Sequence, residues 1–195
     1  MQYYFAPLEG ITGYLYRNIH HKHFPGIDRY YSPFVVTRDG GIMKRKELRD
    51  ILPENNREVT LIPQILTNHA ENFLCAAETM YELGYQEVNL NLGCPSGTVT
   101  GKGRGLLSNP GLVSRIVGKD TGKQELEAFY YELFDAYQQE LSGDVHLLHK
   151  MKELWIFMAP QFTEHEKYLK QIKKSRKLSE YETVVRKLFY EQELA

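Results

Sequence analysis

Strand-like and helix-like segments alternate through the first half of this chain of 195 residues. Runs rich in tyrosine, phenylalanine, valine and isoleucine predict strands. The expected strands are 3–5, 29–36, 59–66 and 87–92. The expected helices between them are 12–23, 44–52 and 68–83, each followed by a proline or glycine that ends it. Strands that alternate with helices of this length form a parallel sheet, so we expect an α/β fold.

The second half of the chain shows only helical patterns. The expected helices are 122–141, 145–158, 164–174 and 180–190. Ser/Thr-x-x-Glu/Gln sequences that begin at Thr121, Thr163 and Ser179 fit the capping box that starts a helix. We therefore predict two domains, an α/β domain at 1–118 and a C-terminal α-helical bundle at 119–195.

Composition narrows the class of protein without identifying its function. Hydrophobic residues make up 42% and charged residues 25%, which is ordinary for a globular chain. No apolar run reaches the length of about 20 residues that spans a bilayer, and residues 1–7 lack the pattern of a signal peptide. Cys75 and Cys94 are far apart and show no zinc-ligand spacing. We expect no metal site, no membrane partner and a reducing, cytoplasmic setting.

Cys94 lies in the loop after the fourth predicted strand, between a glycine and a proline. Function in parallel α/β folds concentrates in such loops, at the carboxyl ends of the strands. A thiol with an ordinary pKa of about 8.5 is mostly protonated at neutral pH and can donate a proton. Most free cysteines are instead small buried hydrophobes, which is what we expect of Cys75 in its helix. Position alone leaves both interpretations of Cys94 open.

Several motifs, in order along the chain, resemble those of tRNA-dihydrouridine synthases. Residues 89–99, Asn-Leu-Asn-Leu-Gly-Cys-Pro-Ser-Gly-Thr-Val, resemble that family's catalytic loop. Residues 6–12 resemble its opening loop, Ala-Pro-Met-Glu-Gly-Val-Thr, and residues 63–66 resemble the end of its third barrel strand. Residues 142–144 and 150–155 resemble the helical RNA-binding domain of bacterial members. The ordered set carries the resemblance, because a lone Gly-Cys-Pro would be weak.

The resemblance implies a flavin-dependent oxidoreductase that reduces uridine in tRNA to 5,6-dihydrouridine. In that family, reduced FMN delivers a hydride to C6 of an extruded uracil, and NADPH reduces the flavin again. The resemblance gives Cys94 the role of protonating C5. It places Ala6 and Pro7 along the flavin. It also places Gln64 at the isoalloxazine edge and Asn91 at the uracil, whereas without it we would interpret them as a strand-end cap and a turn former.

The family's TIM-type (β/α) barrel typically takes about 250 residues, more than this chain provides before its helical tail. We therefore expect an incomplete TIM-type barrel at 1–118. Residues 102–112 combine the loop after the cysteine with the family's last barrel segment, as an internal deletion would leave them, although a compact variant or a sequencing artefact would look the same. The expected FMN phosphate contacts are Gly103, Arg104 and Gly105, although a short Gly-x-Gly more often marks a plain turn. An open sheet also allows self-association through its edge.

The segment 167–177 is strongly basic and contains no acidic residue. Its expected tRNA contacts are Lys167, Lys170, Lys174 and Lys177. Their spacing predicts one helix face, and a basic stripe follows a phosphate backbone without reading its sequence. An ordinary solvated helix face is the alternative.

Two functional hypotheses remain open at this point, an FMN- and NADPH-dependent tRNA-dihydrouridine synthase and a non-catalytic RNA-binding remnant of that family. The loop around Cys94 favours the enzyme. The family has a lysine and a histidine that contact the flavin, and neither has a counterpart between Cys94 and Asn109. Their absence favours the remnant.

Overall fold

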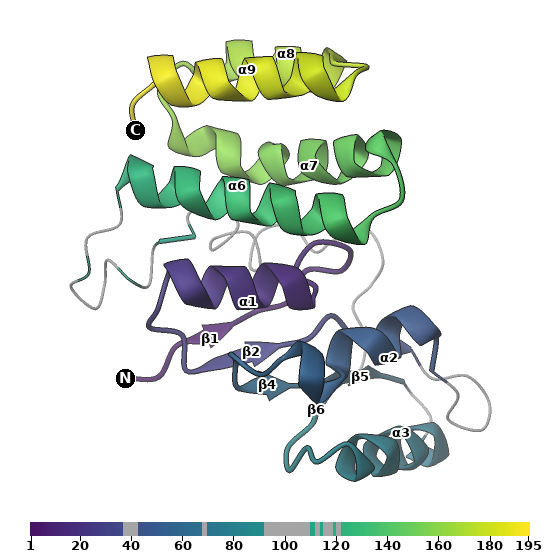
Figure 1. Cartoon of the computed structure of the whole chain (residues 1–195). Coiled ribbons are helices and arrows are strands. Elements are labelled where there is room, and N and C mark those ends of the chain that lie inside the picture. The colour runs from purple at the N-terminus through teal and green to yellow at the C-terminus, as the bar shows by residue number, and fades with distance from the viewer. Residues whose placement is uncertain (37–42, 68–69, 92–109, 112–113, 115–118, 120–121) are drawn as a thin grey trace. The chain divides into compact units, whose positions relative to one another are not determined.

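The computed structural model describes residues 1–36, 43–67, 70–91, 110–111, 114, 119 and 122–195 (Figure 1). The chain divides into two compact units, Met1–Gly103 and Arg104–Ala195. This division and the expected domain boundary at 118/119 both fall between 92 and 121, where few residues are described. Aromatic side chains pack against one another within each unit, so each has a core of its own.

Short parallel strands form the first unit. The strands are β1 (Tyr4–Phe5), β2 (Arg29–Tyr31), β3 (Val35–Val36), β4 (Leu61–Ile62), β5 (Gln64–Leu66) and β6 (Asn89–Asn91). β2 pairs with β1 and β4, and β5 pairs with β3 and β6, all in parallel. Since β2 and β3 belong to one predicted strand and β4 and β5 to the next, the spatial order of the strands follows the chain order.

Helices connect these strands. The helices are α1 (Tyr14–His23), α2 (Arg45–Ile51), the 3-10 helix η2 (Pro53–Asn55) and α3 (Ala70–Glu82). α1 links β1 to β2, α2 and η2 link β3 to β4, and α3 links β5 to β6. The α/β class and the predicted alternation are confirmed. No closed barrel is present in the described part of the chain, so the incomplete barrel stays a prediction.

Proline divides two of the predicted strands. Pro33 and Pro63 have no N–H group to donate to a neighbouring strand. The register also shows one extra residue between β2 and β3 relative to the partner strand, which is a β-bulge. At this break, the hydroxyl of the buried Ser32 accepts a hydrogen bond from the Gln64 N–H at 3.0 Å. The side chain at the bulge therefore accepts a backbone N–H that the strand pairing leaves without a partner.

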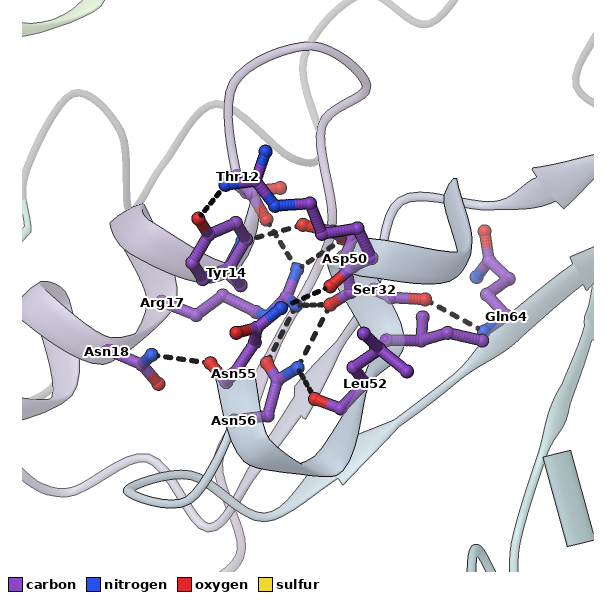
Figure 2. A network of polar contacts seen from close by, with 12 residues as sticks. Thr12, Tyr14, Arg17, Asn18, Ser32, Asp50, Leu52, Asn55, Asn56 and Gln64 are labelled. Atoms are coloured by element: carbon purple, nitrogen blue, oxygen red, sulfur yellow. Dashed lines mark hydrogen bonds and ion pairs between the residues drawn. The ribbon is translucent and has the colours of Figure 1, made fainter. Parts of the chain in front are cut away.

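A fully buried arginine joins α1 to the segment formed by α2 and η2 (Figure 2). Arg17 Nη1 donates to Thr12 O at 2.8 Å and to Asp50 Oδ2 at 3.0 Å. Its Nη2 donates to Asp50 O at 2.7 Å and to Asn56 Oδ1 at 2.8 Å. These bonds compensate for the loss of water around the guanidinium, which would otherwise be very costly to bury.

Asp50 also caps α1 from a different helix. The N-cap residue of α1, Gly13, has no side chain, and Asp50 Oδ1 accepts the backbone N–H of Tyr14 at 2.7 Å instead. A Cβ atom on Gly13 would lie 3.1 Å from that oxygen, which is a tight contact. The glycine therefore gives the carboxylate room to reach the start of the helix.

The second unit is helical. Its helices are α6 (Lys123–Glu140), α7 (Asp144–Met158), the 3-10 helix η3 (Ala159–Gln161), α8 (His165–Lys174) and α9 (Leu178–Glu191). α7 contacts α6, α8 and α9. The four helices predicted from the sequence are confirmed, with ends that differ by at most two residues.

Trp155 of α7 lies at the centre of this unit's core. Its ring is 5.3 Å from that of Tyr130 on α6 and 5.7 Å from that of Phe189 on α9. Trp155 Nε1 donates to the Tyr181 hydroxyl at 2.8 Å, and that hydroxyl lies 2.7 Å from the hydroxyl of Tyr130. Burial raises the pKa of both tyrosines, so the network stays neutral. Each buried polar atom of this trio thus has a partner.

The predicted capping boxes are wrong where the structure describes them. The N-cap of α8 is Glu164, not Thr163. The Thr163 hydroxyl donates to Gln192 Oε1 at 3.1 Å, near the chain's end. The N-cap of α9 is Lys177, so Ser179 lies inside the first turn. Thr121 lies outside the described residues. A tertiary contact thus takes up the Thr163 hydroxyl, whereas α9 simply begins two residues earlier than its sequence pattern predicts.

The expectation for Cys75 is also wrong. Its side chain is exposed on α3 rather than buried. α3 packs against β5 and buries Ala76 and Met80, which leaves Cys75 on another side of the helix. None of the described helices is long and apolar enough to cross a membrane.

Candidate functional site

Three side-chain amides lie in a row across β5 and β6. Gln64 and Asn89 are register partners, and Gln64 Nε2 donates to Asn89 Oδ1 at 2.9 Å. Asn91 Nδ2 donates to Gln64 Oε1 at 3.1 Å. Side chains alternate along a strand, so Asn89 and Asn91 point to the same face of β6. We call Gln64, Asn89 and Asn91 the amide row.

The backbone beneath the amide row is held as well. The Gln64 N–H donates to the Ser32 hydroxyl, a contact drawn in Figure 2. The Asn89 N–H donates to Pro63 O at 2.8 Å. All three amide side chains are half-buried, so they are ordered by the sheet and still accessible to a ligand.

The amide row suits the edge of an imide ring. Each side-chain amide offers two N–H donors and a carbonyl acceptor. The uracil ring and the pyrimidine part of a flavin both present an N–H donor between two carbonyl acceptors. A row of amides can pair with such an edge through complementary hydrogen bonds, as proteins do when they read an extruded base. The residues present therefore fit either ring.

Ala6 and Pro7 follow β1 directly. Ala6 is exposed and Pro7 is half-buried. Because the strands are parallel, this loop lies at the same carboxyl edge as the end of β6. The structure thus brings Gln64 and Asn91 into contact and puts Ala6 and Pro7 at the same edge of the strands.

Four predicted site residues lie outside the described part of the chain. They are Cys94, Gly103, Arg104 and Gly105. Cys94 follows the last residue of β6 by three positions, so its loop continues directly from the amide row. Their roles stay predictions.

The basic segment spans the end of α8 and the turn into α9. Lys167, Lys170 and Lys174 are exposed on α8, with Tyr168 and Ile172 buried on the other side. α8 ends at Lys174, so the prediction that Lys177 continues the same helix face is wrong. The chain turns at Ser175, which is buried and ends the helical spacing. We call the exposed cations of 167–177 the basic corner.

Two side chains outside the basic corner hold its turn. Lys152 of α7 donates through Nζ to Lys173 O at 3.2 Å and also to Ser175 O. A cation suits these carbonyls, because the carboxyl end of a helix carries partial negative charge. Glu180 accepts the Arg176 N–H at 2.9 Å, and this bond lowers the pKa of its carboxyl. These bonds therefore fix the backbone of residues 173–176, which carries part of the basic corner.

Sequence reasoning missed Asn89 and Lys152. Asn89 precedes Asn91 by two positions on a predicted strand, so period-two alternation could have put both on one face. No comparable pattern indicates Lys152, because its partners at the end of α8 and on its C-cap lie 21 and 23 residues away. Among the described residues, no three His, Cys, Asp or Glu side chains are grouped to hold a metal ion.

The amide row, the loop after β1 and the ordered parallel strands agree with a match to a known sequence family. The sequence model described as dihydrouridine synthase (Dus) matches residues 4–125. The chain belongs to the dihydrouridine synthase family. The match covers the strands and helices of the first unit and reaches the start of α6.

One curated dihydrouridine synthase is similar across much of the chain. It is the probable tRNA-dihydrouridine synthase 1 of Synechocystis sp., 26% identical over 156 residues. The aligned part is 70% of this chain and 43% of the relative. The chain thus spans less than half the length of that dihydrouridine synthase.

Proposed function

We propose that this protein is an FMN- and NADPH-dependent synthase that reduces uridine in tRNA to 5,6-dihydrouridine. The observation that carries this proposal is the amide row, a set of donors and acceptors that suits an imide ring at the carboxyl edge of a parallel sheet. Family membership supplies the reaction class, because uridine reduction is what a dihydrouridine synthase performs. The relative named above supports tRNA as the substrate.

Each predicted residue has a chemical role in this proposal. FMN, when bound and reduced by NADPH, supplies the hydride that adds to C6 of the uracil. The Cys94 thiol donates the proton that adds to C5, which completes the reduction of the double bond. Gln64 holds the flavin edge and Asn91 holds the uracil. Loop residues bind the rest of the cofactor: Ala6, Pro7, Gly103, Arg104 and Gly105.

The second unit binds the tRNA in this proposal. Lys167, Lys170 and Lys174 are exposed on α8, and Lys177 is exposed beyond the turn that ends it. Such a surface neutralises phosphates and releases their counterions, without reading base sequence. An incomplete TIM-type barrel and this helical tRNA-binding domain together account for the two units.

A second candidate is a non-catalytic RNA-binding protein derived from the same family. The observation in its favour is length, since the aligned part is only 43% of the relative. A barrel without its later strands would leave the flavin fewer contacts. The basic corner would still bind a polyanion, because its own unit positions it.

The two candidates differ in whether the purified chain retains FMN. We expect a visible flavin spectrum that stays with the protein through gel filtration, followed by NADPH-dependent formation of dihydrouridine in tRNA. Cys94→Ala should abolish that reduction and leave flavin retention intact, because the thiol donates a proton without holding the cofactor. A colourless protein that still binds tRNA would establish the second candidate. Unchanged turnover in the cysteine variant would remove Cys94 from the mechanism.

A further inference from the structure

We propose that Asn89 is a positioning residue, which fixes the orientation of the Gln64 amide toward the flavin edge. This inference rests on the proposed function, because the ligand of Gln64 is the FMN ring. Gln64 is held from both ends, since its Nε2 donates to Asn89 at 2.9 Å and its Oε1 accepts from Asn91 at 3.1 Å. Asn89 is thus the partner that accepts the Gln64 N–H.

Orientation matters because the two ends of an amide are alike in shape and opposite in hydrogen bonding. A glutamine whose amide is turned over exchanges a carbonyl acceptor for an NH₂ donor at the same place. In the observed arrangement, Gln64 keeps one N–H and one oxygen lone pair beyond its bonds to the row. An imide edge needs one donor and one acceptor side by side. A turned amide would set donor against donor, which costs the unpaired groups their solvation.

The strand pairing puts Asn89 in the right place for this task. Asn89 and Gln64 are opposite each other in the register of β5 and β6. The Asn89 backbone is fixed through its N–H bond to Pro63 O. The neighbouring Leu90 alternates to the other face, where it is 41% exposed. The same short strand therefore offers a positioning residue and a control that faces away from the row.

Two variants of Asn89 and one control test whether position 89 matters because it accepts the Gln64 hydrogen bond or only because a side chain fills the space. Asn89→Ala removes the acceptor and leaves the Gln64 amide held by Asn91 alone. Asn89→Asp keeps an acceptor, and a carboxylate can only accept, so it enforces the observed orientation. Leu90→Ala changes the same strand on its other face. Thermal unfolding of each variant shows whether it still folds.

The test is FMN affinity, measured by quenching of flavin fluorescence, together with the visible spectrum of the bound flavin. We expect Asn89→Ala to weaken FMN binding about tenfold, as the loss of one ordered hydrogen bond does, and to shift the flavin spectrum. Asn89→Asp should stay within about threefold of the wild type, and Leu90→Ala should be unchanged. In a Gln64→Ala background, Asn89→Ala should cost nothing more, because Asn89 acts through Gln64.

The outcomes distinguish failure of the proposed function from failure of the positioning role of Asn89. A wild-type chain that retains no FMN would refute the proposed function, and this inference with it. A wild-type chain that binds FMN while Asn89→Ala and Gln64→Ala weaken it additively would refute the positioning role alone. Equal loss in Asn89→Asp and Asn89→Ala would likewise exclude Asn89 as the acceptor that orients Gln64.

Discussion

Arg17 shows at the scale of single residues how this fold accommodates a buried charge. The guanidinium is fully buried and has partners on α2, on η2's C-cap and on the loop before α1. Asp50 is 19% exposed and serves two partners at once, the guanidinium and the first N–H of α1. One carboxylate on α2 therefore holds both the start of α1 and its buried arginine.

Asp50→Ala should destabilise the protein by about 3 kcal/mol, because it leaves a buried cation underpaired and a helix uncapped. Urea unfolding measures this change. The matched control is Arg186→Ala, which breaks an exposed i,i+4 pair with Glu182 and should cost less than about 1 kcal/mol. Equal effects of the two substitutions would show that the Arg17–Asp50 pair does not hold α1 in place.

At the scale of elements, α8 is a helix whose position depends on its neighbours. Its buried side carries Tyr168 and Ile172, and its carboxyl end is held by Lys152 of α7. Helix α9 adds Glu180, which fixes the turn. An isolated helix of this length is marginal in water, so the bundle rather than local propensity gives the basic corner its shape.

Charge reversal at Lys170 and Lys174 should weaken tRNA binding and lower the salt dependence of the affinity. The slope of log affinity against log salt should fall by about two, one for each lost phosphate contact. Filter binding across a salt series measures it. The control is Lys187→Glu on α9, whose partner is Glu191 at 3.6 Å, outside the basic corner. An unchanged slope in the double variant would make the corner an ordinary solvated surface.

At the scale of the whole molecule, the chain consists of two units with separate cores. The second unit's core is built around Trp155, the single tryptophan of the chain. Its contacts with Tyr130, Tyr181 and Phe189 all lie within that unit. A core with internal contacts of this kind does not need the other unit to form.

A fragment of residues 119–195 should therefore fold alone. We expect helical circular dichroism, cooperative thermal unfolding and Trp155 fluorescence at the short wavelength of a buried indole. The full-length chain provides the reference spectrum. Emission at the wavelength of a solvated indole would show that the helical unit depends on residues before 119.

Much of the fold could be predicted from the sequence because its signals are local. Runs of aromatic and branched residues marked the strands, and apolar spacing marked the helices. Pro33 and Pro63 were visible in the sequence, but the bulge that accompanies them was not, since a register belongs to a pair of strands. The capping box at Thr163 failed for a related reason, because its hydroxyl donates to Gln192, the C-cap of α9.

The sequence by itself determined the α/β pattern, the helical tail and the family resemblance. Only the tertiary structure decided that Asn89 accepts from Gln64, that Asp50 caps α1 and that Lys152 holds the end of α8. These contacts join residues 25, 36 and 21 positions apart. Local preferences act over a few residues, whereas the distance between such side chains is set by strand register and helix packing, which form only when the chain is folded.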